Sequence, residues 1–200
     1  MQNYEEKTIK KETLYDGRIF TIEHHTVSLP NGKESTRDIV LHNGAVCVLA
    51  VKDEKILFVR QYRKAVESHV LEIPAGKLDT KTEDPLEACK RELEEETNFR
   101  ANNWSKVMTF YPSPGYCQEA LHLYQAEELE EVLEGALPAD EDEFLDIVWI
   151  ELEEALQMIH NGEIIDGKTI IAIQQYKMQL LESKLARIEE NLTKVAKELA

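Results

Sequence analysis

The chain has 200 residues, a hydrophobic fraction of 42%, a charged fraction of 31% and a formal net charge of −16 at pH 7. This length and composition are typical of one globular domain with appendages. The negative charge argues against a nucleic-acid partner, which requires clustered Lys and Arg, and no apolar stretch has the length that a membrane span needs.

The N-terminal residues and the cysteines predict a cytoplasmic location. The first residues, MQNYEEKTIKKETL, contain no apolar core of the kind that marks an export signal. Cys47, Cys89 and Cys117 are odd in number and lack metal-binding spacing. We therefore expect three free thiols in a reducing compartment.

Residues 1–42 are predicted to form a small antiparallel β domain. The segments RIFTIEHHTVSL (18–29) and STRDIVLH (35–42) alternate polar and apolar positions. Between them lies Pro30-Asn31-Gly32, which is turn chemistry, so the two segments indicate a hairpin.

A second hairpin is predicted from AVCVLAVK (45–52) and ILFVRQY (56–62), joined by Asp53-Glu54. The first of these strands is almost entirely apolar, which favours a central position in a sheet covered on both faces. Shorter strands are expected at VLEI (70–73), KVMTFYP (106–112), ALHLYQAE (120–127) and DIVWI (146–150).

Residues 85–97 carry the clearest helix signals in the chain. Asp84 is a good N-cap, Pro85 suits the first helical position, and Glu87 has the spacing of a capping box. Asn98 tolerates the left-handed conformation that ends a helix. The sequence therefore predicts both ends of this helix.

Two further helices are predicted, an amphipathic one at 151–162 and a longer one from near Lys168. Residues 181–200 add a heptad-patterned helical tail to the main domain, which we place at 43–180. The apolar positions of the tail are Leu181, Leu185, Ile188, Leu192, Val195 and Leu199. Such a pattern is typical either of a helix docked on its own domain or of pairing between subunits.

A glutamate cluster on helix 85–97 suggests a metal site. Glu92 and Glu96 are four residues apart and lie on one face, with Glu95 beside them. The three carboxylates repel one another, and a hard cation such as Mg²⁺ removes this repulsion. Mg²⁺ prefers oxygen ligands, and its coordination shell combines carboxylates with the phosphates of a substrate. Glutamate runs are more often solvated helix faces. The helix caps, the Pro-Ala-Gly loop at 74–76 and the nearby Arg91 favour the metal site here.

Residues 76–99 resemble the Nudix signature, Gly-x5-Glu-x7-Arg-Glu-U-x-Glu-Glu-x-Gly-U, in which U is a bulky aliphatic residue. The matching positions are Gly76, Glu83, Arg91, Glu92, Leu93, Glu95 and Glu96. The chain departs from the signature twice, with six residues rather than five between Gly76 and Glu83 and with Asn98-Phe99 in place of Gly-U. The first change lies in a loop, where length is tolerated, and Asn can adopt the conformation of Gly.

The resemblance implies an α+β fold, a Nudix α/β/α sandwich with a mixed sheet, plus the N-terminal β domain and the C-terminal helical extension. It also implies divalent metal, Mg²⁺ with Mn²⁺ as the alternative. The ligands would be Glu92, Glu96 and the Ala75 carbonyl. Glu95 would assist catalysis and Arg91 would orient the glutamates. Glu83 would be a supporting ligand or a structural residue.

Other segments are similar to bacterial ADP-ribose pyrophosphatases over residues 10–178. The segments that carry this likeness are RDIVLHNGAV (37–46), VRQYRKAVE (59–67) and LEIPAGK (71–77). Pro114, sixteen residues after Asn98, has the position of a proline in that family, although Ser-Pro-Gly is also ordinary turn chemistry.

This second likeness implies a homodimer in which the N-terminal domains are exchanged. Arg37 and Arg63 would contact the ADP moiety, because a guanidinium pairs with phosphate and stacks on bases, and Glu72 would contact adenine or its ribose. The alternative for Arg37 is a surface charge at a strand edge. In the acidic loop 138–144, Glu141 would be the general base and Glu143 a metal ligand. The assignment of these two roles could shift by one residue along the loop. The alternative is a flexible, solvated loop without a catalytic role.

The resemblance thus predicts hydrolysis of ADP-ribose, a small nucleoside diphosphate, to AMP and ribose 5-phosphate. Two other functions remain open. One is hydrolysis of another nucleoside diphosphate derivative, such as a sugar nucleotide, a dinucleotide or a flavin cofactor. The other is a non-catalytic Nudix module that senses a ligand. The intact Arg91 and glutamates argue against the second.

Overall fold

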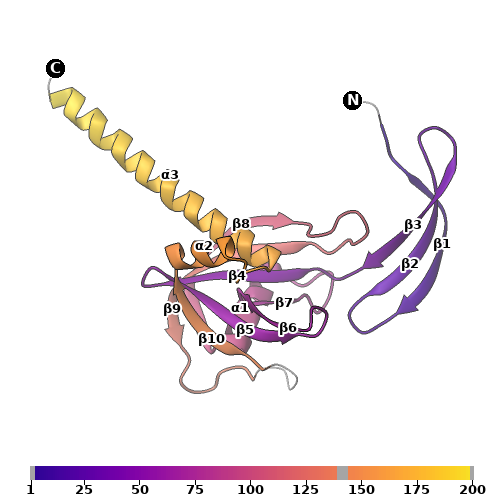
Figure 1. Cartoon of the computed structure of the whole chain (residues 1–200), viewed down its shortest axis with the longest axis horizontal. Coiled ribbons are helices and arrows are strands. Elements are labelled where there is room, and N and C mark those ends of the chain that lie inside the picture. Colours follow the sequence, from indigo (N-terminus) through magenta and orange to yellow (C-terminus); the bar gives the residue numbers. More distant parts are fainter. Residues whose placement is uncertain (1–2, 139–143, 199–200) are drawn as a thin grey trace.

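The computed structural model describes residues 3–138 and 144–198 (Figure 1). Within these ranges the chain forms two sheets and three helices. The strands are β1 (Lys7–Asp16), β2 (Thr21–Ser28), β3 (Glu34–Leu41), β4 (Ala45–Lys52), β5 (Lys55–Arg63), β6 (Ser68–Glu72), β7 (Ala75–Lys77), β8 (Phe99–Phe110), β9 (Leu121–Glu131) and β10 (Asp146–Glu151). The helices are α1 (Pro85–Thr97), α2 (Leu152–His160) and α3 (Gly167–Glu198).

The main sheet is mixed, as predicted. Its order is β10-β5-β4-β9-β8, with β6 added to β5 and β7 added to β4. β4 and β9 are parallel, whereas the other pairs are antiparallel. The apolar strand β4 lies centrally, which confirms what its continuous run of buried residues indicates.

Helices cover both faces of this sheet, and alternate residues of β4 pack against them. Leu49 packs in one core cluster with Ala155 of α2 and Ile173 of α3. The preceding residue, Val48, packs in a second cluster with Leu93 of α1. Because successive side chains of a strand point to opposite faces, the arrangement is an α/β/α sandwich, as predicted.

A split between β4 and β5 creates the place where the candidate site forms. The two strands pair only next to their turn, at Val51–Ile56 and Lys52–Lys55. Beyond that point β5 pairs with β6 and β10, while the start of β4 pairs with β7. The short strand β7 therefore enters the sheet directly beside α1.

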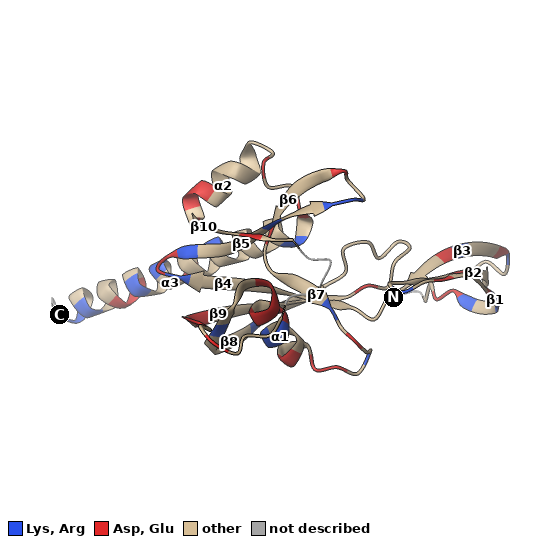
Figure 2. Ribbon diagram, turned by 90° about the horizontal axis from the view of Figure 1, so that it is seen from below, with Lys and Arg blue, Asp and Glu red and all other residues tan. Residues whose placement is uncertain are grey.

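The N-terminal sheet has the order β1-β2-β3 and projects from the main domain (Figures 1 and 2). The predicted hairpin of β2 and β3 is confirmed. Strand β1 was not predicted, because all ten of its residues are exposed and it shows no clear apolar alternation. The sheet joins the main domain at Val40, whose N–H donates to the Tyr116 carbonyl at 2.8 Å and whose carbonyl accepts from the Gln118 N–H at 3.0 Å.

Helix α3 has two distinct halves. Its first half packs on the main domain through residues such as Ala172, Ile173 and Tyr176. From residue 181 to residue 197 every residue is exposed, so the tail does not dock on its own domain. No helix in the described ranges has the length and apolar character that crossing a membrane requires.

Candidate active site

Helix α1 begins and ends where the sequence predicts. The Asp84 side chain accepts a hydrogen bond from the Leu86 N–H at 2.8 Å, and Asn98 adopts the left-handed conformation with φ 58°. One detail of the prediction was wrong. Glu87 accepts a hydrogen bond from the Lys90 Nζ at 2.7 Å and forms no capping-box bond to the Asp84 N–H, a difference that follows from the attraction of unlike charges three residues apart.

The carboxylate of Glu92 lies against the backbone of β7. A Cβ atom added to Gly76 would lie 1.9 Å from the Glu92 Cδ, so only glycine permits this approach. One helical turn later, Glu96 accepts a hydrogen bond from the Ala75 N–H at 3.1 Å. Both glutamates are buried. The structure therefore brings two carboxylates and the Ala75 peptide together.

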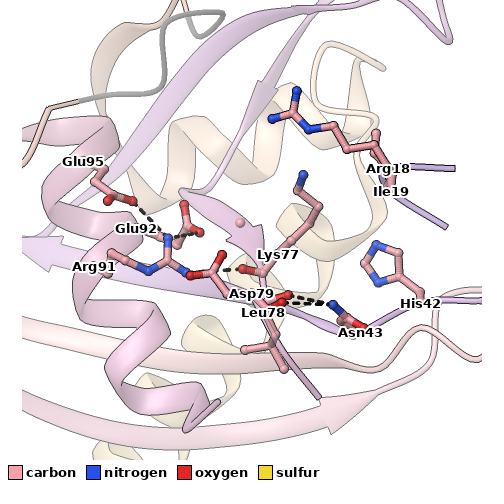
Figure 3. A pocket seen from close by; sticks show the side chains of 11 residues that line it. Arg18, Ile19, His42, Asn43, Lys77, Leu78, Asp79, Arg91, Glu92 and Glu95 are labelled. Carbon is pink, nitrogen blue, oxygen red and sulfur yellow. Dashed lines mark hydrogen bonds and ion pairs between the residues drawn. The ribbon is translucent and has the colours of Figure 1, made fainter. Parts of the chain in front are cut away.

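Arg91 organises the remaining carboxylates of the cluster (Figure 3). Its guanidinium donates to Glu92 at 2.7 Å and to Glu95 at 3.0 Å. It also donates to Glu83 at 3.3 Å and to the Lys77 carbonyl at 3.3 Å. Burial lowers the pKa of Arg91, but the Glu92 and Glu95 carboxylates outweigh it and leave the pKa above its ordinary value.

Glu83 has a structural place in this network. Besides accepting from Arg91, its carboxylate accepts from the Asp79 N–H at 2.5 Å. It thereby fixes the loop that carries the extra residue of the signature. This geometry supports the structural alternative for Glu83.

The donor atoms suit a hard divalent cation. Glu92 and Glu96 place carboxylate oxygens on one face of α1, next to the backbone of Ala75. Within the described ranges, no three Asp, Glu, His or Cys side chains form a complete ligand set. Mg²⁺ characteristically uses one or two carboxylates together with waters and substrate phosphates, so the residues present fit the ion.

Two adjoining cavities open beside the cluster. The first, of about 460 Å³, is lined by Arg91, Glu92 and Glu95 on one side and by Arg18 across from α1 (Figure 3). The second, of about 890 Å³, shares Arg18 with the first. Its further lining residues include Tyr62, Arg63, Phe110, Tyr111, Pro112, Asp166 and Lys168. A combined space with acidic, basic and aromatic walls fits a small anionic molecule with a ring.

Arg63 lines the second cavity, whereas its partner Glu72 is buried and lines neither cavity. The Arg63 guanidinium donates to the Glu72 carboxylate through two bonds of 2.7 and 2.8 Å. Lys168, at the start of α3, also donates to Glu72 and to Asp166. Burial raises the pKa of Glu72, but the Arg63 bond and the Lys168 charge outweigh it and leave the pKa below its ordinary value.

The other predicted site residues lie elsewhere. Arg37, on β3, pairs with Glu6 and does not line either cavity of its own chain. Pro114 lies in the exposed turn after β8 and lines neither cavity, although Pro112 lines the second. Glu141 and Glu143 lie outside the described residues.

Sequence reasoning missed three charged groups near the site. Arg18 comes from the β1–β2 turn, and Lys168 approaches Glu72 from 96 residues further along the chain. Glu94, the variable position of the signature, is buried and accepts hydrogen bonds from Arg100 and from the Leu137 N–H at 3.0 Å. The Arg100 bond lowers the pKa of Glu94. Of these three residues, only Arg18 could have been noticed in the sequence, because it is a basic residue in the turn-type segment Asp16-Gly17-Arg18.

Comparison with protein families agrees with this geometry. Residues 40–172 match the NUDIX domain, which is more than half of the chain. The chain belongs to the Nudix family. Residues 6–40 match the nucleoside diphosphate sugar hydrolase N-terminal domain, and Nudix hydrolases generally require a divalent metal.

Several relatives are similar to this chain over most of their length. An ADP-ribose pyrophosphatase of Bacillus subtilis is 47% identical over 90% of this chain and 96% of its own. A methanol dehydrogenase activator of Bacillus methanolicus is also 47% identical, over 88% and 95% of the two chains. An ADP-ribose pyrophosphatase of Mycobacterium tuberculosis is 34% identical, over 86% and 84%.

A solved structure, described as an ADP compounds hydrolase, has the same fold. Its TM-score is 0.81 at 23% sequence identity, and the match covers 92% of this chain and 98% of the other. The predicted Nudix fold is therefore confirmed.

Replacing Gly76 by Ala is expected to weaken metal binding by about 10- to 100-fold, because the added methyl group must displace the Glu92 carboxylate. Titration with Mn²⁺, followed by electron paramagnetic resonance, measures the affinity. Gly115→Ala is the matched control, since no atom lies within 4 Å of a Cβ at that glycine. Equal affinity of Gly76→Ala and wild type would contradict the close approach.

A second prediction concerns acid stability. Because the folded-state pKa of Glu72 lies below 4.5, its ion pairs stabilise the fold above about pH 4.5, and this contribution is lost as the pH falls through the folded-state pKa. Glu72→Gln should lower the free energy of unfolding at pH 7 by about 3 kcal/mol and reduce the loss of stability on acidification. Urea unfolding between pH 3.5 and 7 tests this, and an unchanged dependence on pH would refute it.

Proposed function

We propose that this chain hydrolyses the diphosphate of ADP-ribose to AMP and ribose 5-phosphate with a bound divalent metal. The observation that carries the proposal is the burial of Glu92 and Glu96 against β7, with Glu92 lining the first cavity and the larger second cavity adjoining it. Two buried carboxylates one helical turn apart, both against the backbone of β7, supply the oxygen ligands that a hard divalent cation takes.

Each residue of the cluster has a role in this proposal. Glu92, Glu96 and the Ala75 carbonyl would hold the metal, Mg²⁺ or Mn²⁺. Arg91 orients Glu92 and Glu95 through the bonds described above. The ion would supply positive charge to the diphosphate and a more acidic water. Glu141 would be the general base and Glu143 a further metal ligand, as the likeness to ADP-ribose pyrophosphatases implies.

The second cavity is proposed to bind the adenosine part of the substrate. Arg63 lines it with aromatic side chains, and Tyr62 and Tyr111 supply ring surfaces. An Arg fork offers donors to a phosphate, a ribose or a base, and aromatic rings offer stacking. Glu72 is buried as the ion-pair partner of Arg63, so its predicted contact with adenine or its ribose stays a prediction. Pro114 lines neither cavity of its own chain, so its predicted contact with the substrate stays a prediction.

We further propose a homodimer in which N-terminal sheets are exchanged. The sheet projects from its own main domain and exposes Ile9, Leu14 and Tyr15, which are 53 to 58% accessible. Arg37 does not reach a cavity of its own chain, so its proposed substrate contact requires the partner's site. We also propose the division of the chain after residues 42 and 180, which agrees with the end of β3 at Leu41 and with the exposure of residues 181–197.

A cytoplasmic location is part of the proposal. It rests on Cys47, Cys89 and Cys117, none of which forms a disulfide. A nucleotide such as ADP-ribose is also a substrate that a cytoplasmic hydrolase would meet.

The relative named a methanol dehydrogenase activator supports a second candidate, activation of a dehydrogenase. Its identity to this chain equals that of the Bacillus subtilis pyrophosphatase, so identity alone does not choose between them. The metal-site residues favour hydrolysis. GDP-mannose pyrophosphatases, at 28% identity, represent the sugar-nucleotide alternative.

A substrate panel tests the proposed function. With Mg²⁺, ADP-ribose should be hydrolysed faster than GDP-mannose, a dinucleotide or FAD, with AMP and ribose 5-phosphate as products. Glu96→Gln should lower turnover by orders of magnitude because it removes a ligand. Glu87→Gln, on the exposed side of the same helix, is the control. Normal turnover by Glu96→Gln would overturn the site, and faster hydrolysis of another compound would overturn the substrate.

The acidic loop is tested separately. Glu141→Gln should abolish most turnover with little change in metal affinity, whereas Glu143→Gln should weaken both, because only the second is a proposed ligand. Steady-state kinetics at several Mg²⁺ concentrations measure the two effects. If both variants behave as wild type, the base and the ligand lie elsewhere.

A further inference from the structure

The second half of α3 presents an apolar surface that the proposed reaction does not use. Residues 181–197 are all exposed, and the helix extends away from the main domain on the side opposite the N-terminal sheet (Figure 1). The Nudix domain match ends at residue 172, so this segment lies beyond the family's common fold.

The apolar side chains of this segment form one continuous seam. Their spacing alternates between four and three residues, which places them on a single face of the helix. Their accessible fractions range from 51 to 65%. The members of the seam are Met178, Leu181, Leu185, Ile188, Leu192 and Val195. A long exposed stripe of this kind marks a surface that binds another chain.

The seam is carried on a helix that is already nucleated. Ile170, Ile173 and Tyr176 fix the first half of α3 to the main domain. Short isolated helices are marginal because their first turn is costly, but here the exposed half extends an anchored helix. A partner therefore meets an ordered surface about 27 Å long, at 1.5 Å for each residue.

The charges beside the seam identify the partner as a second copy in parallel register. With Leu185 and Leu192 at heptad position a, Lys184 takes position g and Glu189 takes position e. In a parallel pair, g of one helix faces the e five residues later in the other, so Lys184 would face Glu189 of the second copy. In an antiparallel pair that overlaps the whole seam, g faces g and e faces e, so Glu189 would face Glu182 and Lys184 would face Asn191, with no opposite charge for either.

Both groups are available for this contact. In the part of the chain that the structure describes, neither Lys184 nor Glu189 forms an ion pair, whereas Lys194 pairs with Glu190 along the outer face. Residues 181–200 carry equal numbers of acidic and basic side chains, as the alternating colours of α3 in Figure 2 illustrate. Two chains with a net charge of −16 therefore meet at a neutral segment, where mutual repulsion is lowest.

We propose that residues 178–198 form a parallel, in-register coiled coil with the same segment of a second copy. This contact is separate from the exchanged N-terminal sheet, which lies at the other end of the molecule. It links two hydrolase domains by their C-terminal helices and leaves both cavities open.

Disulfide trapping in the full chain tests the pairing. In a parallel coil, identical a positions face each other, so Leu192→Cys should form a covalent dimer under mild oxidation. Glu190→Cys, at the outward f position, is the matched control and should cross-link many times more slowly. Both are made with Cys117→Ser, because Cys117 is the one native cysteine that is not fully buried. Absence of the Leu192→Cys dimer, or equal trapping by Glu190→Cys, overturns the pairing.

Charge reversal in the Leu192→Cys chain tests the register. Lys184→Glu alone should slow trapping several-fold, because two glutamates then face each other, and Glu189→Lys alone should do the same with two lysines. The double variant should restore the original rate. Failure of the double variant to restore the rate overturns the parallel register. Activity serves as a folding check, since neither residue lies near a cavity.

Discussion

The approach of the Glu92 carboxylate to the backbone at Gly76 is the contact on which the site depends. It requires a residue without a side chain on β7 and a helix whose position is fixed to within about an ångström. The split of β4 from β5 lets β7 enter the sheet, and the caps at Asp84 and Asn98 fix the helix. The strand split, β7 and the two helix caps lie apart in the sequence, and all of them are needed for the contact between Glu92 and Gly76.

Electrostatics explains why the contact needs a counter-charge. Arg91 contacts Glu83, Glu92 and Glu95, but Glu96 lies on the far side of the cluster against the Ala75 N–H. The Arg91 guanidinium carries one positive charge against the three carboxylates that it contacts. A divalent cation at the proposed site would add positive charge and would allow an acidic protein to approach an anionic diphosphate. At the second cavity the charges balance, since Arg63 and Lys168 pair with two carboxylates, Glu72 and Asp166.

The sequence predicted what short-range chemistry determines. Helix α1 was located to the residue because caps act within a few positions, and β4 was placed centrally because its apolar run is continuous. The tail's seam was visible for the same reason. β1 escaped prediction because its exposed residues show no alternation, and Lys168 escaped because its partner, Glu72, is 96 residues away. The spacing of the signature identified Gly76, but only the structure gives the reason for a glycine there. Arg37 and Pro114 remain predictions, because a single chain places them away from both cavities.

The molecule thus has its chemistry in the middle and surfaces for association at its two ends. The central claim is that the glutamates of α1 and the backbone of β7 bind the metal together. Crystals grown with Mn²⁺ and examined by anomalous scattering test it most directly. The account predicts an anomalous peak within coordination distance of Glu92, Glu96 and the Ala75 carbonyl. A fully occupied peak elsewhere, with none between α1 and β7, would contradict it.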